Sequence, residues 1–184
     1  MLTTIPDGVV CYLDATIFYY HLVDAPPLSD DCSDLLLRIA QDHVQGVTSS
    51  VAIAEATHKV MLAEVVQRHG VDHRGLIARL KRHPALLDGL TNHQRVAATV
   101  RSLGLPVEPI TLALLARGAA LSAQKRLLTN DALTLAVMEK LGVTTLATND
   151  DDFDAVDGIT VCKPTRAAPP PAAMDTCPSG DSAQ

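Results

Sequence analysis

The sequence predicts an α/β fold, with a short central parallel sheet flanked by helices, and three observations support this class. Short apolar segments such as "VVCYL" (9–13) and "VTTLA" (143–147) are typical of buried strands. Longer segments of helical periodicity separate them along the chain. Leu, Val, Ile and Ala must supply the core, because the 184-residue chain has no Trp, two Phe and three Tyr. Strands that alternate with helices indicate a parallel sheet.

The first expected strand, residues 9–13, stops at Asp14, and the segment "ATIFYYHL" directly after this aspartate begins a helix. A second, amphipathic helix is expected at residues 30–46. It has aspartates in its first turn, where negative charge favours the helix dipole. Gly46 stands at its expected end, because glycine commonly stops a helix.

A brief extended segment, "VTSS" (47–50), leads into the third helix and supplies serines as N-caps. That helix is expected at residues 51–70. Its apolar residues recur at helical spacing and form a stripe along one side: Val51, Ala54, Met61, Leu62 and Val65. We expect this stripe to face the core.

The second half of the chain continues the alternation. Residues 71–104 contain two expected helices, which Pro84 separates. The remaining expected elements are a strand at 107–110, helices at 111–124 and 129–142, and strands at 143–147 and 159–163. In the second of these helices, Thr129 or Asn130 is the expected N-cap and Gly142 is the expected stop.

One domain is expected at residues 1–164, with a helical insertion at about residues 68–104. Residues 165–184 are rich in Pro, Ala and Ser, which predicts a disordered tail. The N-terminus lacks a basic segment followed by a long apolar one, and no stretch of about 18 apolar residues occurs, so we expect a cytoplasmic protein without a membrane span. The four cysteines have neither CxxC nor zinc spacing, which predicts buried free thiols.

The formal net charge of −6 argues against a broad basic surface for nucleic acid. It does not exclude a nuclease, because a divalent cation makes an acidic pocket locally far less negative. One stretch, residues 68–83, is basic and holds five Lys or Arg and three His. Two interpretations stay open for it: a solvated helical surface, or a helical clip that contacts RNA or a protein partner.

Four carboxylates occur at positions where a parallel sheet gathers functional groups. Asp14 follows the first expected strand and Asp150 follows the fourth, and sites form at the carboxyl ends of such strands. Asp131 lies in the first turn of its helix, which is equally a plain capping position. Glu55 lies too far into its helix for a capping box, because Ala52 stands three residues before it. Carboxylates gathered from different elements hold hard divalent cations.

The segment "NDDDFDAVD" holds five aspartates between Asp150 and Asp157. A solvated turn is the ordinary interpretation of such a run. An EF-hand calcium loop is excluded, because it requires Gly and Glu where the chain has Ala155 and Val161. The third interpretation is one wall of an acidic metal pocket, which requires other carboxylates at the ends of other elements.

The acids and their flanking residues resemble the PIN-domain nuclease family, and within it the VapC-like toxins of toxin–antitoxin pairs. Four motifs stand in the family's order: "LDATIF" around Asp14, "SSVAIAE" ending at Glu55, "TNDALTLAVMEKLG" around Asp131 and "LATNDDDF" around Asp150. The resemblance covers about residues 8–163. Each motif is weak alone, whereas four in order are fairly specific.

The resemblance implies a three-layer PIN-like fold and a ribonuclease that uses Mg²⁺ or Mn²⁺ to hydrolyse RNA. The implied catalytic residues and metal ligands are Asp14, Glu55, Asp131 and Asp150, with Asp152 as an auxiliary ligand. Thr16 and Thr148 are the implied supporting hydroxyl residues. The implied partners are the RNA substrate, an antitoxin protein and a second copy of the chain in a homodimer.

The first motif departs from the family, which often has Ser or Thr directly after the acid. Here that residue is Ala15, which cannot donate a hydrogen bond, and we expect Thr16 to compensate. The remaining acids of the run, Asp151, Asp154 and Asp157, are expected to be solvated turn residues.

A catalytically silent PIN-like module that binds RNA or a protein partner is the alternative from a different functional class. Two other folds also place an acidic pocket on a doubly wound sheet. A phosphoreceiver domain requires adjacent acids after the first strand, and Asp14 has no acidic neighbour. A haloacid-dehalogenase-type phosphatase requires D-x-D there, and position 16 is threonine. Both are disfavoured.

Overall fold

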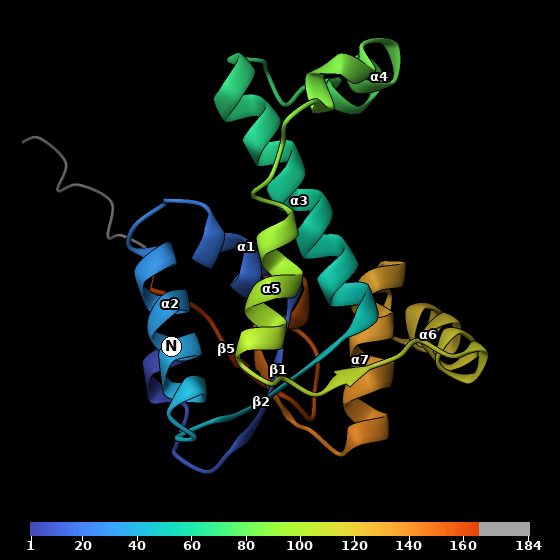
Figure 1. The fold of residues 1–184 in the computed structure, drawn as a ribbon. Helices are drawn as coiled ribbons and strands as arrows, with labels where there is room; N and C mark the ends of the chain where they lie inside the picture. Colours follow the sequence, from blue (N-terminus) through green and yellow to red (C-terminus); the bar gives the residue numbers. More distant parts are fainter. Residues whose placement is uncertain (166–184) are drawn as a thin grey trace, which may run out of the picture.

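The structure of the protein, a computed structural model, describes residues 1–165. They form three layers, in which a parallel sheet lies between two layers of helices (Figure 1). The strands are β1 (Val10–Leu13), β2 (Gln45–Ser49), β3 (Val107–Glu108), β4 (Thr145–Ala147) and β5 (Thr160–Cys162). They are ordered β3-β2-β1-β4-β5, and all four pairings are parallel. The predicted α/β class is confirmed. The tail expected at 165–184 lies outside the described residues, except for its first residue.

Helices cover both faces of the sheet (Figure 1). The α-helices are α1 (Ala15–Leu22), α2 (Leu28–Ala40), α3 (Ser50–His69), α4 (Leu76–Arg82), α5 (Gln94–Ser102), α6 (Leu112–Lys125) and α7 (Thr129–Leu141). Short 3-10 helices are η1 (Leu2–Thr4), η2 (Pro84–Leu87) and η3 (Asp151–Phe153). Helices α1, α2, α3 and α5 lie on one face, and α6 and α7 lie on the other. None of the described helices has the length and apolar character of a membrane span.

Two hydrophobic cores lie on opposite sides of the sheet, because successive residues of a strand point to opposite faces. In β1, Cys11 and Leu13 pack into the core under α1, α2, α3 and α5. Tyr12, between them, packs into the core under α6 and α7. The cysteines in the described part of the chain are buried free thiols, as expected: Cys11, Cys32 and Cys162.

The second helix is shorter than expected, and Gly46 belongs to a strand. The prediction of a helix over residues 30–46 is wrong at its end, because α2 stops well before Gly46. The chain reverses at Asp42, which has a left-handed φ of 61°. In β2, a Cβ at Gly46 would lie 2.7 Å from Leu105 Cδ2 and 2.9 Å from Ile39 Cδ1. The glycine therefore permits close packing over the strand and does not stop a helix.

The start of α7 also differs from the expectation. Its N-cap is Leu128, which makes no side-chain capping bond, so neither Thr129 nor Asn130 caps the helix. Asn130 lies inside the first turn and donates its amide to Glu55 of α3. The helix ends at Gly142 as expected, in the left-handed conformation that glycine adopts readily.

Helix α3 extends beyond the body of the molecule and carries α4 and η2 at its far end (Figure 1). Residues 65–90 are named here the arm tip. They have a hydrophobic cluster of their own, formed by Val65, Val71, Leu76, Leu80 and Leu90. The stretch expected as a helical insertion, residues 68–104, includes most of this tip. It then continues into α5, which returns to the main core through Val96 and Val100.

Candidate active site

Asp14 is held at the carboxyl end of β1, as the N-cap of α1. Its Oδ2 accepts hydrogen bonds from the Thr16 amide at 3.2 Å, the Thr16 hydroxyl at 2.8 Å and the Thr148 hydroxyl at 2.8 Å. Asp14 is 9 % exposed. The three bonds fix the carboxylate, and no donor among the described residues reaches its other oxygen, Oδ1.

Thr16 and Thr148 join the ends of β1 and β4. Their hydroxyl oxygens lie 3.3 Å apart. Thr16 Oγ1 also accepts from the amide of Asn149 at 2.9 Å, and Thr148 Oγ1 accepts from the amide of Asp150 at 3.0 Å. These bonds set the path of the chain after β4 and therefore the position of Asp150. Thr16 supplies the hydroxyl that Ala15 lacks.

Glu55 reaches the site from the second turn of α3. The helix starts where Ser49 caps it and accepts the amide of Ala52 at 3.3 Å. Glu55 Oε1 lies 2.7 Å from Lys59 Nζ, one turn further along the helix. Glu55 Oε2 accepts from Asn130 Nδ2 at 2.8 Å. The carboxylate thereby links α3 to the first turn of α7.

An open pocket of about 420 Å³ lies between α3, the start of α7 and the loop after β4. The predicted acids that line it are Glu55, Asp131, Asp150 and Asp152. Asp14 is not a lining residue, but Thr148 binds both Asp14 and the backbone of Asp150. The structure therefore brings the predicted acids together from separate elements at the carboxyl ends of the strands, where parallel α/β folds gather functional groups.

The protonation of Asp131 reflects this crowding. Burial is the largest influence and raises the pKa of Asp131 to about 6 together with the charges of four carboxylates: Asp150, Asp152, Asp14 and Glu55. Burial disfavours the charged form, and nearby like charges disfavour it further. All five predicted acids therefore belong to one electrostatic cluster.

Lys59 is a site residue that the motifs did not reveal. Burial by itself lowers the pKa of its ammonium group, but the hydrogen bond and charge of Glu55, with Asp14 and Asp150, outweigh burial and raise the pKa. Lys59 is thus a cation beside the acid cluster, with its side chain 38 % exposed. The spacing contained a signal, because a lysine four residues after a glutamate forms a pair along a helix.

The acid run after β4 divides into two groups. Asp150 and Asp152 line the pocket, and Asp150 Oδ1 accepts the amide of Asp152 at 3.0 Å. Asp151 and Asp154 are exposed, but each lies 2.6 Å from Lys163 Nζ. Both are exposed, as expected of turn residues, and they also hold the residue that follows β5, which was not expected.

The carboxylates lie around one pocket but are not close enough together to form a complete metal site. Within residues 1–165, no group of three Asp, Glu, His or Cys side chains is arranged to hold a metal ion. Two features account for this spacing. The like charges repel one another, and Glu55 is drawn to Lys59 and Asn130. The donors of the cluster are carboxylate oxygens, which Mg²⁺ and Mn²⁺ prefer.

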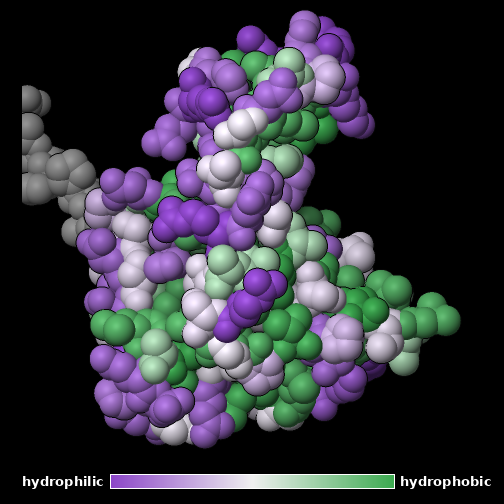
Figure 2. All heavy atoms as spheres, viewed as in Figure 1, coloured by the Kyte–Doolittle hydropathy of each residue, from purple (hydrophilic) through white to green (hydrophobic). Residues whose placement is uncertain are grey.

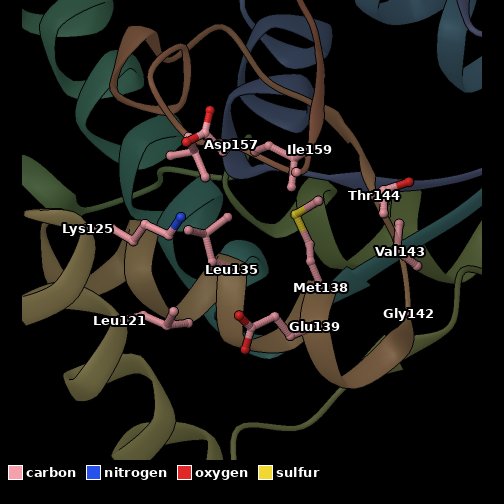
Figure 3. Close-up of a pocket in the computed structure, with 12 residues that line it drawn as sticks. Leu121, Lys125, Leu135, Met138, Glu139, Gly142, Val143, Thr144, Asp157 and Ile159 are labelled. Carbon is pink, nitrogen blue, oxygen red and sulfur yellow. The ribbon is translucent and has the colours of Figure 1, made fainter.

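A more apolar pocket, of about 300 Å³, lies at the opposite edge of the sheet (Figure 3). Gly142, Val143 and Thr144, which precede β4, line one side of it. Met138 and Ile159 project toward each other across it (Figure 3). This pocket lies at the amino ends of the strands and lacks the cluster of acids, so the acidic pocket is the better candidate for a catalytic centre.

Comparison with known proteins gives one family match and several structures of similar fold. The family model described as PIN domain matches residues 11–159. No curated protein matches the sequence.

Three solved structures illustrate the likeness in fold. VapC20 of Mycobacterium tuberculosis, described as a sarcin-ricin loop cleaving toxin, has 18 % identity and a TM-score of 0.52, with 81 % of this chain and 96 % of that one covered. A toxin–antitoxin complex from Klebsiella pneumoniae has 17 % identity and a TM-score of 0.50, with 84 % of this chain and 98 % of that one covered. VapBC2 of Rickettsia felis, bound to a promoter DNA fragment, has 16 % identity and a TM-score of 0.51, with 84 % of this chain and 98 % of that one covered.

Proposed function

The chain belongs to the PIN domain family, and we propose that it is a divalent-metal-dependent endoribonuclease that hydrolyses RNA phosphodiester bonds. The observation that carries the proposal is the acid cluster. Four predicted acids line one pocket, and the charges of the other three, with that of the buried Asp14, act on Asp131. Such a cluster is costly unless cations offset it, and metal-assisted hydrolysis uses carboxylates for that purpose.

We propose as ligands of Mg²⁺ or Mn²⁺ the residues Asp14, Glu55, Asp131 and Asp150, with Asp152 as an auxiliary ligand. Asp14 fits this role because its hydrogen bonds all reach Oδ2, so that Oδ1 can face a cation. Asp131 fits it because burial and the surrounding negative charges raise its pKa, and a cation would offset those charges. Thr16 and Thr148 support the site by holding Asp14 in place.

An ion in such a site lowers the pKa of a water molecule and stabilises negative charge on the phosphate and the leaving oxygen. The chain supplies position and charge. Asp14 stays fixed by its hydrogen bonds, and Asp150 is placed by the bond from its amide to Thr148. Lys59 provides positive charge beside the cluster, where it can face an RNA phosphate and reduce its repulsion by the carboxylates.

We further propose that the chain is the toxin of a toxin–antitoxin pair and forms a homodimer. The similar structures include a sarcin-ricin loop cleaving toxin and a toxin–antitoxin complex. A surface that suits self-association lies on α6 and the residue before α7, where Leu112 is 82 % exposed, Leu115 45 % and Leu128 73 %. Hydrophobic residues gather at this end of the molecule in Figure 2. Exposed apolar surface of this kind is typical of contact sites.

Cleavage of a mixed tRNA and mRNA pool, with Mn²⁺, Mg²⁺ or EDTA, tests the proposal. We expect metal-dependent cutting by wild type and a loss of about a hundredfold or more in rate for Asp14→Asn and Asp131→Asn. Asp157→Asn is the matched control, because it neutralises an exposed aspartate that does not line the acidic pocket. Cutting that persists in EDTA, or in both cluster variants, would contradict the assignment.

A catalytically silent PIN-like module is the second candidate. Two observations favour it. No three ligating side chains among residues 1–165 are arranged to hold an ion, and Glu55 already forms an ion pair with Lys59. Calorimetric titration with Mn²⁺ separates the two candidates. A silent module would bind Mn²⁺ weakly or would bind it and leave the RNA pool intact, whereas the nuclease binds Mn²⁺ and loses that binding in Asp14→Asn.

A further inference from the structure

The arm tip has the opposite charge to the molecule as a whole. Residues 65–90 contain five Lys or Arg and two Asp, a formal charge of +3, whereas the full chain has a formal charge of −6. The body that carries the acid cluster is therefore more negative than the total. The positive charge is concentrated at the far end of α3, which Figure 2 shows as a hydrophilic surface.

Four of the five basic side chains are exposed and without acidic partners: Arg74, Arg79, Lys81 and Arg82. None of them forms an ion pair with any residue in the described part of the chain, 1–165. Arg68 differs, because its Nη1 donates to the Gly89 carbonyl at 2.8 Å and so holds the tip together. Arg82 Nε donates only to the Ala78 carbonyl of its own helix, at 3.3 Å, so it does not tie separate parts of the tip together as Arg68 does. All four are available to a partner.

The basic side chains of the tip are carried by an ordered segment with its own hydrophobic cluster. Leu76 and Leu80 bury the inner face of α4 in the tip cluster, which turns Lys81 and Arg82 outward. Glu64 accepts the amides of residues 91 and 92, both at 2.9 Å, and so anchors the returning chain to α3. Preorganised charges bind a ligand with a smaller loss of conformational entropy than charges on a disordered loop.

The acidic pocket creates a need for such a basic segment. RNA is a polyanion, and a pocket lined by four carboxylates repels its phosphates, even when an ion offsets part of that charge. Affinity for RNA must therefore come largely from other surfaces. The tip lies on the same helix as Glu55, and at 1.5 Å per residue the end of α3 is about 20 Å from that glutamate.

We propose that the arm tip binds the phosphate backbone of the RNA substrate, about 20 Å from the bond that is cut. The inference rests on the proposed ribonuclease function. A strand spans that distance in about six stacked nucleotides, at 3.4 Å per step. Contacts to phosphate position a nucleic acid and carry no sequence information. The tip therefore contributes affinity for RNA that extends beyond the pocket and leaves cleavage of very short RNA unaffected.

Binding of a labelled single-stranded RNA of about 20 nucleotides, followed by fluorescence anisotropy, tests the proposal. The background is the full chain with Asp14→Asn, so that the RNA stays intact. We compare Lys81→Gln/Arg82→Gln with the control Arg101→Gln/Lys125→Gln, which removes one Lys and one Arg from exposed positions outside the tip. The tip variant should bind the RNA about tenfold more weakly than the background does. The slope of log K against the logarithm of the salt concentration should become shallower by about 1.4, which is about 0.7 for each of the two lost phosphate contacts. The control should bind as the background does.

Other outcomes overturn the proposal. Equal Kd values and salt slopes for the tip and control variants would mean that the tip makes no specific contribution. A tip variant that binds RNA normally but fails to bind a purified cognate antitoxin would identify the tip as a protein contact.

Cleavage separates this inference from the proposed function. In the otherwise native chain, the tip variant should cut RNA of about five nucleotides as wild type does and cut the longer RNA less efficiently, through a higher KM. If wild type cuts no RNA while the tip variant still loses binding, the proposed nuclease fails and the tip contact stands. If wild type cuts and the tip variant shows no loss on long RNA, the tip contact fails alone.

Discussion

Asp14 and Asp131 carry the same carboxyl group in different surroundings. Asp14 accepts three hydrogen bonds on one oxygen, from Thr16 and Thr148. Asp131 is partly buried, and this burial, together with the like charges around it, raises its pKa to about 6. Such differences in surroundings separate the roles of neighbouring carboxyl groups in acidic sites. Asp131 is consequently the residue whose titration reports the charge of the whole cluster.

The raised pKa of Asp131 predicts that the metal-free protein loses stability as the pH rises. The ordinary pKa of 3.8 applies to the unfolded chain and about 6 to the folded one, so the folded state binds the proton more tightly. The resulting stabilisation is fully present below pH 3.8 and is lost as the pH rises through 6. In EDTA, the Tm should fall between about pH 4.5 and about pH 7, and Asp131→Asn should reduce that fall.

Asp157→Asn is the control for this measurement, because it removes an exposed aspartate outside the acidic pocket. It should keep the pH dependence of wild type. Added Mn²⁺ should raise the Tm more at the higher pH, where the carboxylates are charged and can bind it. An Asp131→Asn protein whose Tm follows the same course as that of wild type would show that another group is responsible.

Lys59 predicts a change in metal affinity. It lies 2.7 Å from Glu55 and adds positive charge near Asp14 and Asp150, so it competes with a cation for the same carboxylates. We expect Lys59→Met to bind Mn²⁺ more tightly by about 1 kcal/mol, or about fivefold in Kd, in calorimetric titration. The control is Lys125→Met, a lysine on the rim of the apolar pocket (Figure 3). Equal Kd values for both variants would refute the competition.

Sequence patterns predicted the acids of the candidate site but not the lysine beside them. Asp14 and Asp150 were predictable because each follows an apolar strand, and the carboxyl ends of parallel strands meet at one edge. The i,i+4 spacing signals the pair of Lys59 with Glu55. The approach of Lys59 to Asp14 and Asp150 depends instead on where α3 lies relative to β1 and β4, which no local pattern contains. The pairing of Asp151 and Asp154 with Lys163 depends in the same way on the position of the last strand.

At the scale of elements, α3 shows that small residues make the buried face of a helix hard to predict from a hydrophobicity pattern. The expected stripe included Ala54, which is exposed, whereas the buried residues nearer the site are Ala52, Ala56 and Val60. Alanine is weakly hydrophobic, so its burial adds little to an apolar pattern, yet it lets two helices approach closely. The buried face of α3 packs on α1 and leaves Glu55 on the side that meets α7.

Gly46 predicts a coupling between β2 and the residues that cover it. Gly46→Ala should destabilise the protein by about 1–3 kcal/mol in urea unfolding, because the new Cβ crowds Leu105 Cδ2 at 2.7 Å and Ile39 Cδ1 at 2.9 Å. In a Leu105→Ala background the same substitution should cost less, since the closer obstacle is gone. If the losses in unfolding free energy of Gly46→Ala and Leu105→Ala add strictly in this double-mutant cycle, the new Cβ at position 46 does not contact Leu105.

The order and type of the elements were predictable, and their boundaries were less so. Apolar strands and periodic helices are local properties, and they indicated the parallel sheet that the structure confirms. The end of α2 was not predictable from Gly46, because glycine both stops helices and permits close packing. The positions of Leu105, far along the chain, and of Ile39 distinguish the two uses.

At the scale of the whole molecule, charge and packing divide the chain in the same place. The body holds the acid cluster and two cores on opposite sides of the sheet. The arm tip holds exposed basic residues and a small core of its own. A small core with few neighbours supports less stability than a large one, so local opening of the tip should cost less free energy than unfolding of the body.

Leu80→Ala tests this division. Leu80 is 7 % exposed in the tip cluster, and its truncation should weaken that cluster by about 2–4 kcal/mol. In hydrogen exchange, α4 and η2 should lose protection while β1 and α7 exchange as in wild type. Leu135→Ala, in the core under α7, is the matched control and should lower protection throughout the body. If Leu80→Ala lowers the protection of β1 as much as that of α4, the tip and the body form one cooperative unit. Because Lys81 and Arg82 follow Leu80 directly, a locally opened tip should also bind long RNA more weakly while Mn²⁺ affinity stays unchanged.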